Sequence, residues 1–281
     1  TVDKMTPIRF LKLLGIYAKI DLAWLVRDTK YALAAMSADM ISNLSAVSAV
    51  FLIAIRFDGI GGMSSDEVLF MMAYSTLVTG LFIMFGNNNN IHISRVIGRG
   101  QLEHMFIQPV PLHVQLMTCG FGPFTGGGNF LVGMGLLFIS LQRLSLQVTP
   151  MWVLALCSYL FATMTIIVAR AYLVSTIAFY SPVAAEEIST VAIEGTWMLS
   201  TFPLSGMPRA IQLSLITILP EGLMAWFPAM ALLGRPPLLG AYYPLIFAML
   251  LAAVAAVAFK KGMKYYVTKG SNRYLPYGFR R

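Results

Sequence analysis

Charged residues within apolar runs are the first candidates for chemistry in this sequence. Asp39, Arg170 and Glu194 each lie in a run of mostly apolar residues. A charge in such surroundings is costly, so these positions predict either a polar pathway or gate, or a structural ion pair between helices. For Arg170 the candidate partners are Glu186 and Glu187. Glu194 lies a turn or two inside its run, where a side chain can instead extend to the membrane surface.

Motifs for common catalytic and nucleotide-binding sites are missing from the sequence. It contains no G-x-x-x-x-G-K-[ST] loop to hold ATP phosphates, no H-E-x-x-H and no G-x-S-x-G. The three histidines, His92, His104 and His113, have no metal-ligand spacing with carboxylates. We therefore expect no catalytic residue, no metal and no cofactor in this chain. An intramembrane enzyme stays open as an alternative, supported only by Asp39 and Glu194.

The composition requires a lipid environment. Of 281 residues, 58% are hydrophobic and only 11% are charged, and the mean hydropathy is +0.73. A soluble domain carries about 25% charged residues. The net charge of +8 does not indicate nucleic acid, because the basic residues lie at the two ends and in one central segment, beside apolar runs. That pattern is typical of cytoplasmic loops of a membrane protein.

The apolar runs predict an all-α integral membrane protein. A crossing helix needs about 20 apolar residues, and six runs are candidates: residues 31–55, 68–85, 114–141, 151–180, 187–207 and 241–259. The third run is rich in glycine, including Gly126, Gly127 and Gly128, which permits close helix approach or a break in the helix. The tail, residues 260–281, is strongly basic.

Two further segments are apolar but do not predict a crossing. Residues 7–30 place apolar residues on one helical face and basic residues elsewhere, which predicts a helix lying in the membrane interface or, alternatively, packed on a partner. Residues 211–234 are split at Pro220 and Glu221 into two pieces too short to cross. This predicts a re-entrant hairpin between the fifth and sixth spans, with Pro220 and Glu221 as gate candidates.

A polar segment, residues 87–112, separates the second and third runs. Asn87 to Asn90 can cap a helix over residues 91–107. The apolar residues recur at three- and four-residue spacing, while Arg95, Arg99 and Glu103 face elsewhere. The helix either docks on a protein or is incidental in a solvated loop. The apolar positions are Ile91, Ile93, Val96, Ile97, Leu102, Met105 and Phe106.

The basic residues predict the orientation. With six spans, fifteen of the 20 Lys and Arg residues fall on the side of the two termini and the 91–107 helix, and four fall on the other side. Loops rich in Lys and Arg stay in the cytoplasm. We therefore expect both termini and the 91–107 helix to be cytoplasmic.

This order of elements resembles the permease subunit of ABC-2 type ABC exporters, closest to the branch of ABC-2 family transporter proteins. The segments GRGQLEHMFIQPVP (98–111), FPLSGMPRAIQ (202–212) and ILPEGLMAWFPAMALLG (218–234) carry the local resemblance. It implies that residues 91–107 form a coupling helix that contacts a separate ATPase subunit through Ile91 to Phe106. It also implies two ATPase copies that carry ATP and Mg, a second permease, identical or homologous, and the bacterial cytoplasmic membrane.

Alternating access between two permeases, driven by closure of the ATPases, is the mechanism that the resemblance implies. The alternative is a secondary transporter or channel that needs no ATPase. Against it, the two halves show no inverted repeat and no matching pair of broken helices.

Overall fold

The computed structural model describes residues 6–86, 93–98, 100–118, 120–181, 202–236 and 239–270, together with 188, 191, 192 and 195. Throughout these residues the elements are helices joined by turns, with no strand. The expectation of an all-α protein is confirmed.

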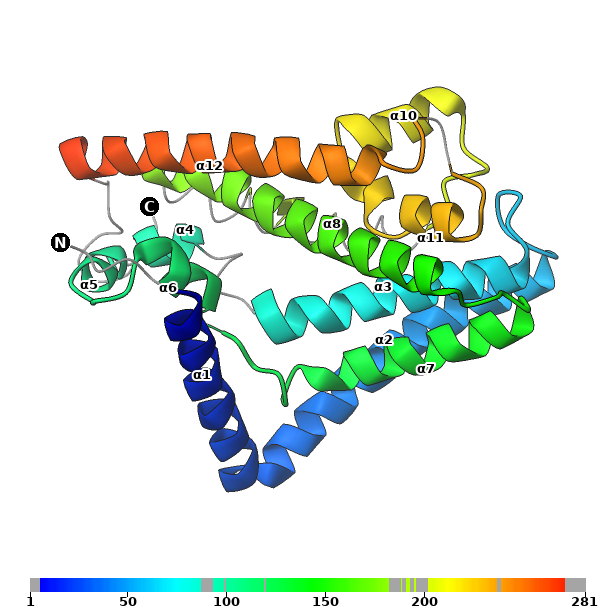
Figure 1. Ribbon diagram of the computed structural model, residues 1–281, viewed down its shortest axis with the longest axis horizontal. Coiled ribbons are helices and arrows are strands. Elements are labelled where there is room, and N and C mark those ends of the chain that lie inside the picture. Colours follow the sequence, from blue (N-terminus) through cyan, green and yellow to red (C-terminus); the bar gives the residue numbers. More distant parts are fainter. Residues whose placement is uncertain are drawn as a thin grey trace.

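Within the described residues, four helices are long and apolar enough to cross a membrane. Helix α3 is the most enclosed, with 67% of its apolar window buried, against 11% for α2. Figure 1 shows α3 between α8 on one side and α2 with α7 on the other. The chain is therefore a multi-pass membrane protein. The four helices are α2 (Thr29–Arg56), α3 (Ser65–Gly86), α8 (Pro150–Ser175), which continues into the 3-10 helix η1 (Thr176–Phe179), and α12 (Tyr243–Lys269).

The end of α12 gives the bundle one basic end. The helix continues ten residues beyond the expected span of 241–259 and carries Lys260, Lys261, Lys264 and Lys269. Helices α8 and α12 lie side by side and run in the same direction, so η1 lies at the same end (Figure 1). We call this the basic end of the bundle.

The glycine-rich third run forms two helices instead of one. Helix α6 (Leu112–Thr118) ends before Gly120, which has a φ of +128°. Helix α7 (Gly127–Arg143) begins after a turn that contains Pro123. An unbroken helix over 114–141 is therefore not formed. From the sequence, these glycines predicted either close helix approach or a break in the helix. The structure contains both.

The expected fifth span, residues 187–207, falls mostly outside the described residues, as do Glu186, Glu187 and Glu194. Its described residues 188, 191, 192 and 195 are helical, whereas residues 202–207 form bends and turns, because Pro203 and the following Gly206 disfavour a helix. The number of six spans stays a prediction.

Helix α1 (Pro7–Arg27) leaves the bundle and meets α2 at a sharp corner (Figure 1). Thr6 caps its start, and none of its residues is buried. Asp21 ties it to the turn before α7. The carboxylate accepts bonds from the backbone N–H of Phe124 at 2.8 Å and from the hydroxyl of Thr125 at 2.6 Å. An interfacial position for α1 stays a prediction.

Helices α3 and α7 approach each other backbone to backbone. A Cβ on Gly133 would lie 2.6 Å from the Cα of Leu77, and one on Gly80 would collide with the backbone of Phe130. In lipid, helix association depends on such close packing, because apolar side chains gain nothing by leaving hydrocarbon. These two glycines therefore fix the α3–α7 pair.

Replacing Gly133 with alanine is expected to lower the apparent melting temperature of the purified protein in detergent, because α3 and α7 must separate to admit the methyl group. Gly135→Ala is the matched control: it lies on the same helix, and a Cβ there meets nothing within 4 Å. Alanine also has the higher helix propensity, by about 1 kcal/mol in water. Gly135→Ala should thus leave stability unchanged or raise it. An equal loss in both variants would contradict the close approach.

Candidate functional site

The polar segment between the second and third runs folds as two short helices. These are α4 (Ile93–Gly98) and α5 (Leu102–Phe106), and α6 follows. The expected single helix over 91–107 is wrong, because the backbone turns at Gly100, whose φ of +67° ends a right-handed helix. Asn87 to Asn90, Ile91 and Arg99 lie outside the described residues, and for Arg95 only the backbone is described.

The apolar face of this segment points into the chain's own bundle. Ile93, Ile97 and Leu102 are fully buried, and Val96 is 9% exposed. They form a cluster with Leu116, Ala178, Phe179 and Tyr266, from α6, η1 and α12. In this structure these four side chains cannot contact a partner, which corrects the expectation that they do. The spacing identified an apolar face correctly but not what that face packs against.

Phe179 of η1 joins this segment to α12. Its ring lies against Gly262, where an added Cβ would collide with it. It also makes edge contacts with Phe259 and Tyr266, at 5.3 and 6.0 Å between ring centroids. The end of α8, the start of the α4–α6 segment and the basic end of α12 are therefore one packed unit.

A hydrogen bond links α5 to α12 directly. The hydroxyl of Tyr266 donates to the carboxylate of Glu103 at 2.6 Å, and the ring of Phe106 lies 6.5 Å from that of Tyr266. Glu103 was expected to contact a partner, and it contacts α12 instead. Gln115 steadies the following turn by donating to the carbonyl of Met105 at 2.9 Å.

The outer edge of α5 is the part of the segment that a partner can reach. Ile107 is 82% exposed and Phe106 is 44% exposed. Gln101 and His104 are exposed as well, and Met105 is half-buried. We use the term α5 edge for Gln101, His104, Phe106 and Ile107.

A second candidate site is the helical hairpin formed by α10 (Arg209–Thr217), η2 (Pro220–Leu223) and α11 (Trp226–Leu232). Its re-entrant position in the membrane stays a prediction. It runs along α8 from the end opposite the basic end (Figure 1). The indole of Trp152 donates to the carbonyl of Leu232 at 3.1 Å, and the hydroxyl of Thr163 donates to the carbonyl of Leu223 at 3.3 Å. Trp152 and Thr163 are about 16 Å apart along α8, at 1.5 Å per residue.

An ion pair lies at the deep end of this hairpin. Arg170 of α8 and Glu221 of η2 approach to 2.6 Å, and their side chains are 15% and 3% exposed. All four residues of η2, from Pro220 to Leu223, are buried. The structure thus brings together two residues that the sequence singled out separately. Glu221 was not among the partners expected for Arg170 from the sequence; Glu186 and Glu187, which were, lie outside the described residues.

Where the helices of the hairpin are interrupted, backbone carbonyls lose their partners within the helix, and side chains of neighbouring helices donate to them. Tyr243 of α12 donates to the carbonyl of Ile216 at 2.9 Å. The hydroxyls of Tyr74 and Thr163 lie 2.9 Å apart. Because Thr163 donates to the hairpin at Leu223, Tyr74 is the donor to Thr163. Side chains of α3, α8 and α12 therefore hold the hairpin.

The glycine triplet, Gly126 to Gly128, was a further candidate for the translocation path. Two of its glycines lie where another segment comes close, and one does not. A Cβ on Gly126 would lie 2.9 Å from the backbone N of Met84, and one on Gly128 would lie 3.1 Å from the side chain of Met40. A Cβ on Gly127 meets nothing within 4 Å. Asp39 is exposed on α2 and forms no ion pair within the described part of the chain.

Comparison with known proteins identifies a family. A family model described as ABC-2 family transporter protein matches residues 41–270, which is most of the chain. No curated protein and no solved structure gives a significant match.

The Arg170–Glu221 pair predicts that the losses of stability caused by substituting its two residues are not additive. Glu221→Gln and Arg170→Met should each lower the apparent melting temperature in detergent, because removing one partner of a buried pair costs about 3–5 kcal/mol. The double variant should lose much less than the sum of the two losses.

The control for this cycle is the ion pair between Arg143 and Asp66. It has a separation of 3.3 Å, and its side chains are 53% and 34% exposed. Asp66→Asn should cost at most about 1 kcal/mol, because water screens an exposed pair. Additive losses for Arg170 and Glu221, or a loss for Asp66→Asn as large as theirs, would contradict the role of the buried pair.

Proposed function

Because the chain belongs to the ABC-2 family of transporter proteins, we propose that it is the transmembrane subunit of an ATP-driven exporter. It forms a translocation path with a second permease, identical or homologous. Two separate ATPase subunits bind ATP and Mg and supply the energy. The complex lies in the bacterial cytoplasmic membrane, with both termini of this chain in the cytoplasm, as the distribution of Lys and Arg favours.

The contact of the α4–α6 segment with both η1 and α12 carries this proposal. A segment that transmits force from an ATPase must be attached to the spans that it moves. Ile93, Ile97 and Leu102 provide that attachment by burial, and the Tyr266–Glu103 bond provides it by direct contact. Closely packed elements move as rigid bodies between discrete arrangements, so a push on this segment displaces the ends of α8 and α12.

From there the displacement reaches the hairpin through α8. This helix is continuous from Pro150 to Ser175 and carries Arg170 near its basic end. Arg170 holds Glu221, so η2 follows α8 or the ion pair breaks. In the proposed cycle, closure of the ATPases draws the α4–α6 segments together, and the hairpin opens or closes the outer side of the path. Pro220 and Glu221 form the moving part of this gate.

The α5 edge is the proposed contact with the ATPase. Ile107 is a large apolar side chain that is almost fully exposed, next to polar residues at the end of a short helix. Such a residue fits a pocket on a partner better than it fits water. Arg95 and Arg99 remain polar candidates for the same contact.

The second permease is supported by Asp39. A carboxylate on the exposed face of a spanning helix is costly against hydrocarbon, and α2 is the least covered of the four long helices. A second permease that covers this face would place Asp39 along the path between the two chains.

The proposal predicts that ABC ATPase subunits co-purify with the chain in mild detergent. Ile107→Asp should reduce their recovery at least tenfold, because a charge replaces the apolar contact while the fold keeps an exposed side chain. Ile107→Val is the matched control and should retain them. Mass spectrometry of the purified material measures both. Wild-type protein without any ATPase would overturn the proposed function, and unchanged recovery with Ile107→Asp would overturn the contact at the α5 edge.

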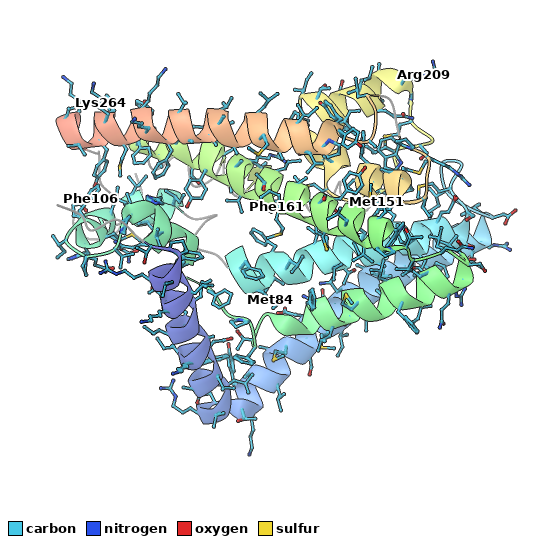
Figure 2. All side chains as sticks on the ribbon, viewed as in Figure 1. Met84, Phe106, Met151, Phe161, Arg209 and Lys264 are labelled. Atoms are coloured by element: carbon cyan, nitrogen blue, oxygen red, sulfur yellow. The ribbon has the colours of Figure 1, made fainter. Side chains whose placement is uncertain are left out.

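The route of force predicts a different phenotype for Tyr266→Phe. This change removes the hydroxyl that donates to Glu103, and a bond to a charged group contributes about 1.5–3 kcal/mol. We expect the ATPases to stay bound while the hairpin responds less to ATP. Spin labels at Met151 and Arg209, both exposed at the hairpin end of α8 (Figure 2), report that response as a distance change on ATP trapping.

Tyr265→Phe is the control for this experiment. Tyr265 is the preceding residue on α12, and its ring contacts that of Tyr180 at 4.7 Å between ring centroids. Its substitution should leave the ATP-dependent distance change intact. A full response in Tyr266→Phe would show that force reaches the hairpin by another route.

A further inference from the structure

An open groove of about 980 Å³ lies between α8 and α12. Its volume is in the range of small-molecule sites, about 300–1,000 Å³. Phe106 and Leu112, from α5 and α6, close one end. The proposed function assigns no ligand to this groove.

The wall formed by α12 changes from small apolar residues to lysines along its length. Ala252, Ala255 and Ala256 leave the wall concave, and Phe259, Lys260 and Lys264 follow on the same face. The spacing of three and four residues keeps all six on one side of the helix. Lys261 and Lys269 lie on other faces and do not line the groove.

The wall formed by α8 is apolar except for hydroxyl groups. Phe161, Val168 and Tyr172 line it. The hydroxyl of Tyr172 is buried and has no hydrogen-bond partner among the described residues. That hydroxyl is enclosed by the protein itself, so the surface of α8 that faces the groove is apolar apart from Thr165.

Positive charge gathers at one end of the groove. Lys260 and Lys264 are exposed, and His113 of α6 lies beside them. In Figure 2, Lys264 and Phe106 lie together at the basic end, while Phe161 lies toward the middle of α8. From Ala252 to Lys264 the groove extends about 18 Å, at 1.5 Å per residue. That length is close to the depth of one hydrocarbon leaflet, about 15 Å.

We propose that this groove binds an anionic phospholipid of the leaflet at the basic end. An acyl chain lies along the alanines of α12, and the phosphate lies between Lys260 and Lys264. The long apolar wall and the cationic end match the two parts of such a lipid, and lysines at this depth attract anionic headgroups. The bound lipid would join α5 and α6 to both spans.

Binding is tested with the purified full-length protein by native mass spectrometry, after incubation with phosphatidylglycerol or with phosphatidylcholine. We expect retention of phosphatidylglycerol alone. The double variant Lys260→Gln/Lys264→Gln should weaken it about 25-fold, since each lysine near the headgroups contributes about fivefold. The control Lys261→Gln/Lys269→Gln removes the same charge from the same helix end, outside the groove, and should bind as the wild type does.

Ala256→Phe tests the groove with all lysines present. Ala256 is exposed, so the ring can fill the groove without disturbing the α8–α12 contact, and phosphatidylglycerol should be lost. Equal weakening by the two lysine pairs would overturn the proposal in favour of general surface attraction. Equal retention of both lipids would overturn it as well. So would a disulfide between cysteines placed at position 256 of two copies, which would show that a second chain fills the groove.

Discussion

An interrupted helix releases backbone carbonyls that need other hydrogen-bond partners, and this constraint governs the α10–α11 hairpin. Its breaks release backbone carbonyls beside α8 and α12. Thr163 and Tyr243 donate to two of them, and Trp152 donates to a third. Backbone carbonyls that are buried away from water need such partners. The hairpin therefore depends on the side chains of α3, α8 and α12, and it cannot move without changing their contacts.

Periodicity and composition predicted the features that depend on one segment at a time. The long apolar helices, the all-α class and the split at Pro220 follow from run length and from proline chemistry. The apolar face of residues 93–106 was predicted correctly as a face. What that face contacts depends on η1 and α12, which are distant in the sequence, and no local spacing contains that information.

The Arg170–Glu221 pair shows the same limit. Each charge was conspicuous because its surroundings are apolar, and opposite charges in lipid require partners. Glu186 and Glu187 were nearer in the sequence and were the expected partners. The hairpin brings Glu221 back along α8 to Arg170, a contact that only the tertiary fold reveals. Likewise the glycine triplet was noticed for its density, but Gly80 and Gly133, which lie outside the triplet, hold α3 against α7.

Both sites converge on α8, and this has a mechanical consequence. At the basic end, η1 is packed into the α4–α6 segment through Phe179. Nearer its middle, α8 holds the hairpin through Thr163 and Arg170. A helix of hydrogen-bonded turns resists compression, so the two contacts cannot shift independently unless α8 bends, and its described residues contain no proline after Pro150 and no glycine. A force applied at the α5 edge must therefore reach Glu221, or break the contacts at Phe179 first.

Breaking the contacts at Phe179 is the costlier outcome. It would separate the α4–α6 segment from the bundle and expose the fully buried side chains of Ile93, Ile97 and Leu102.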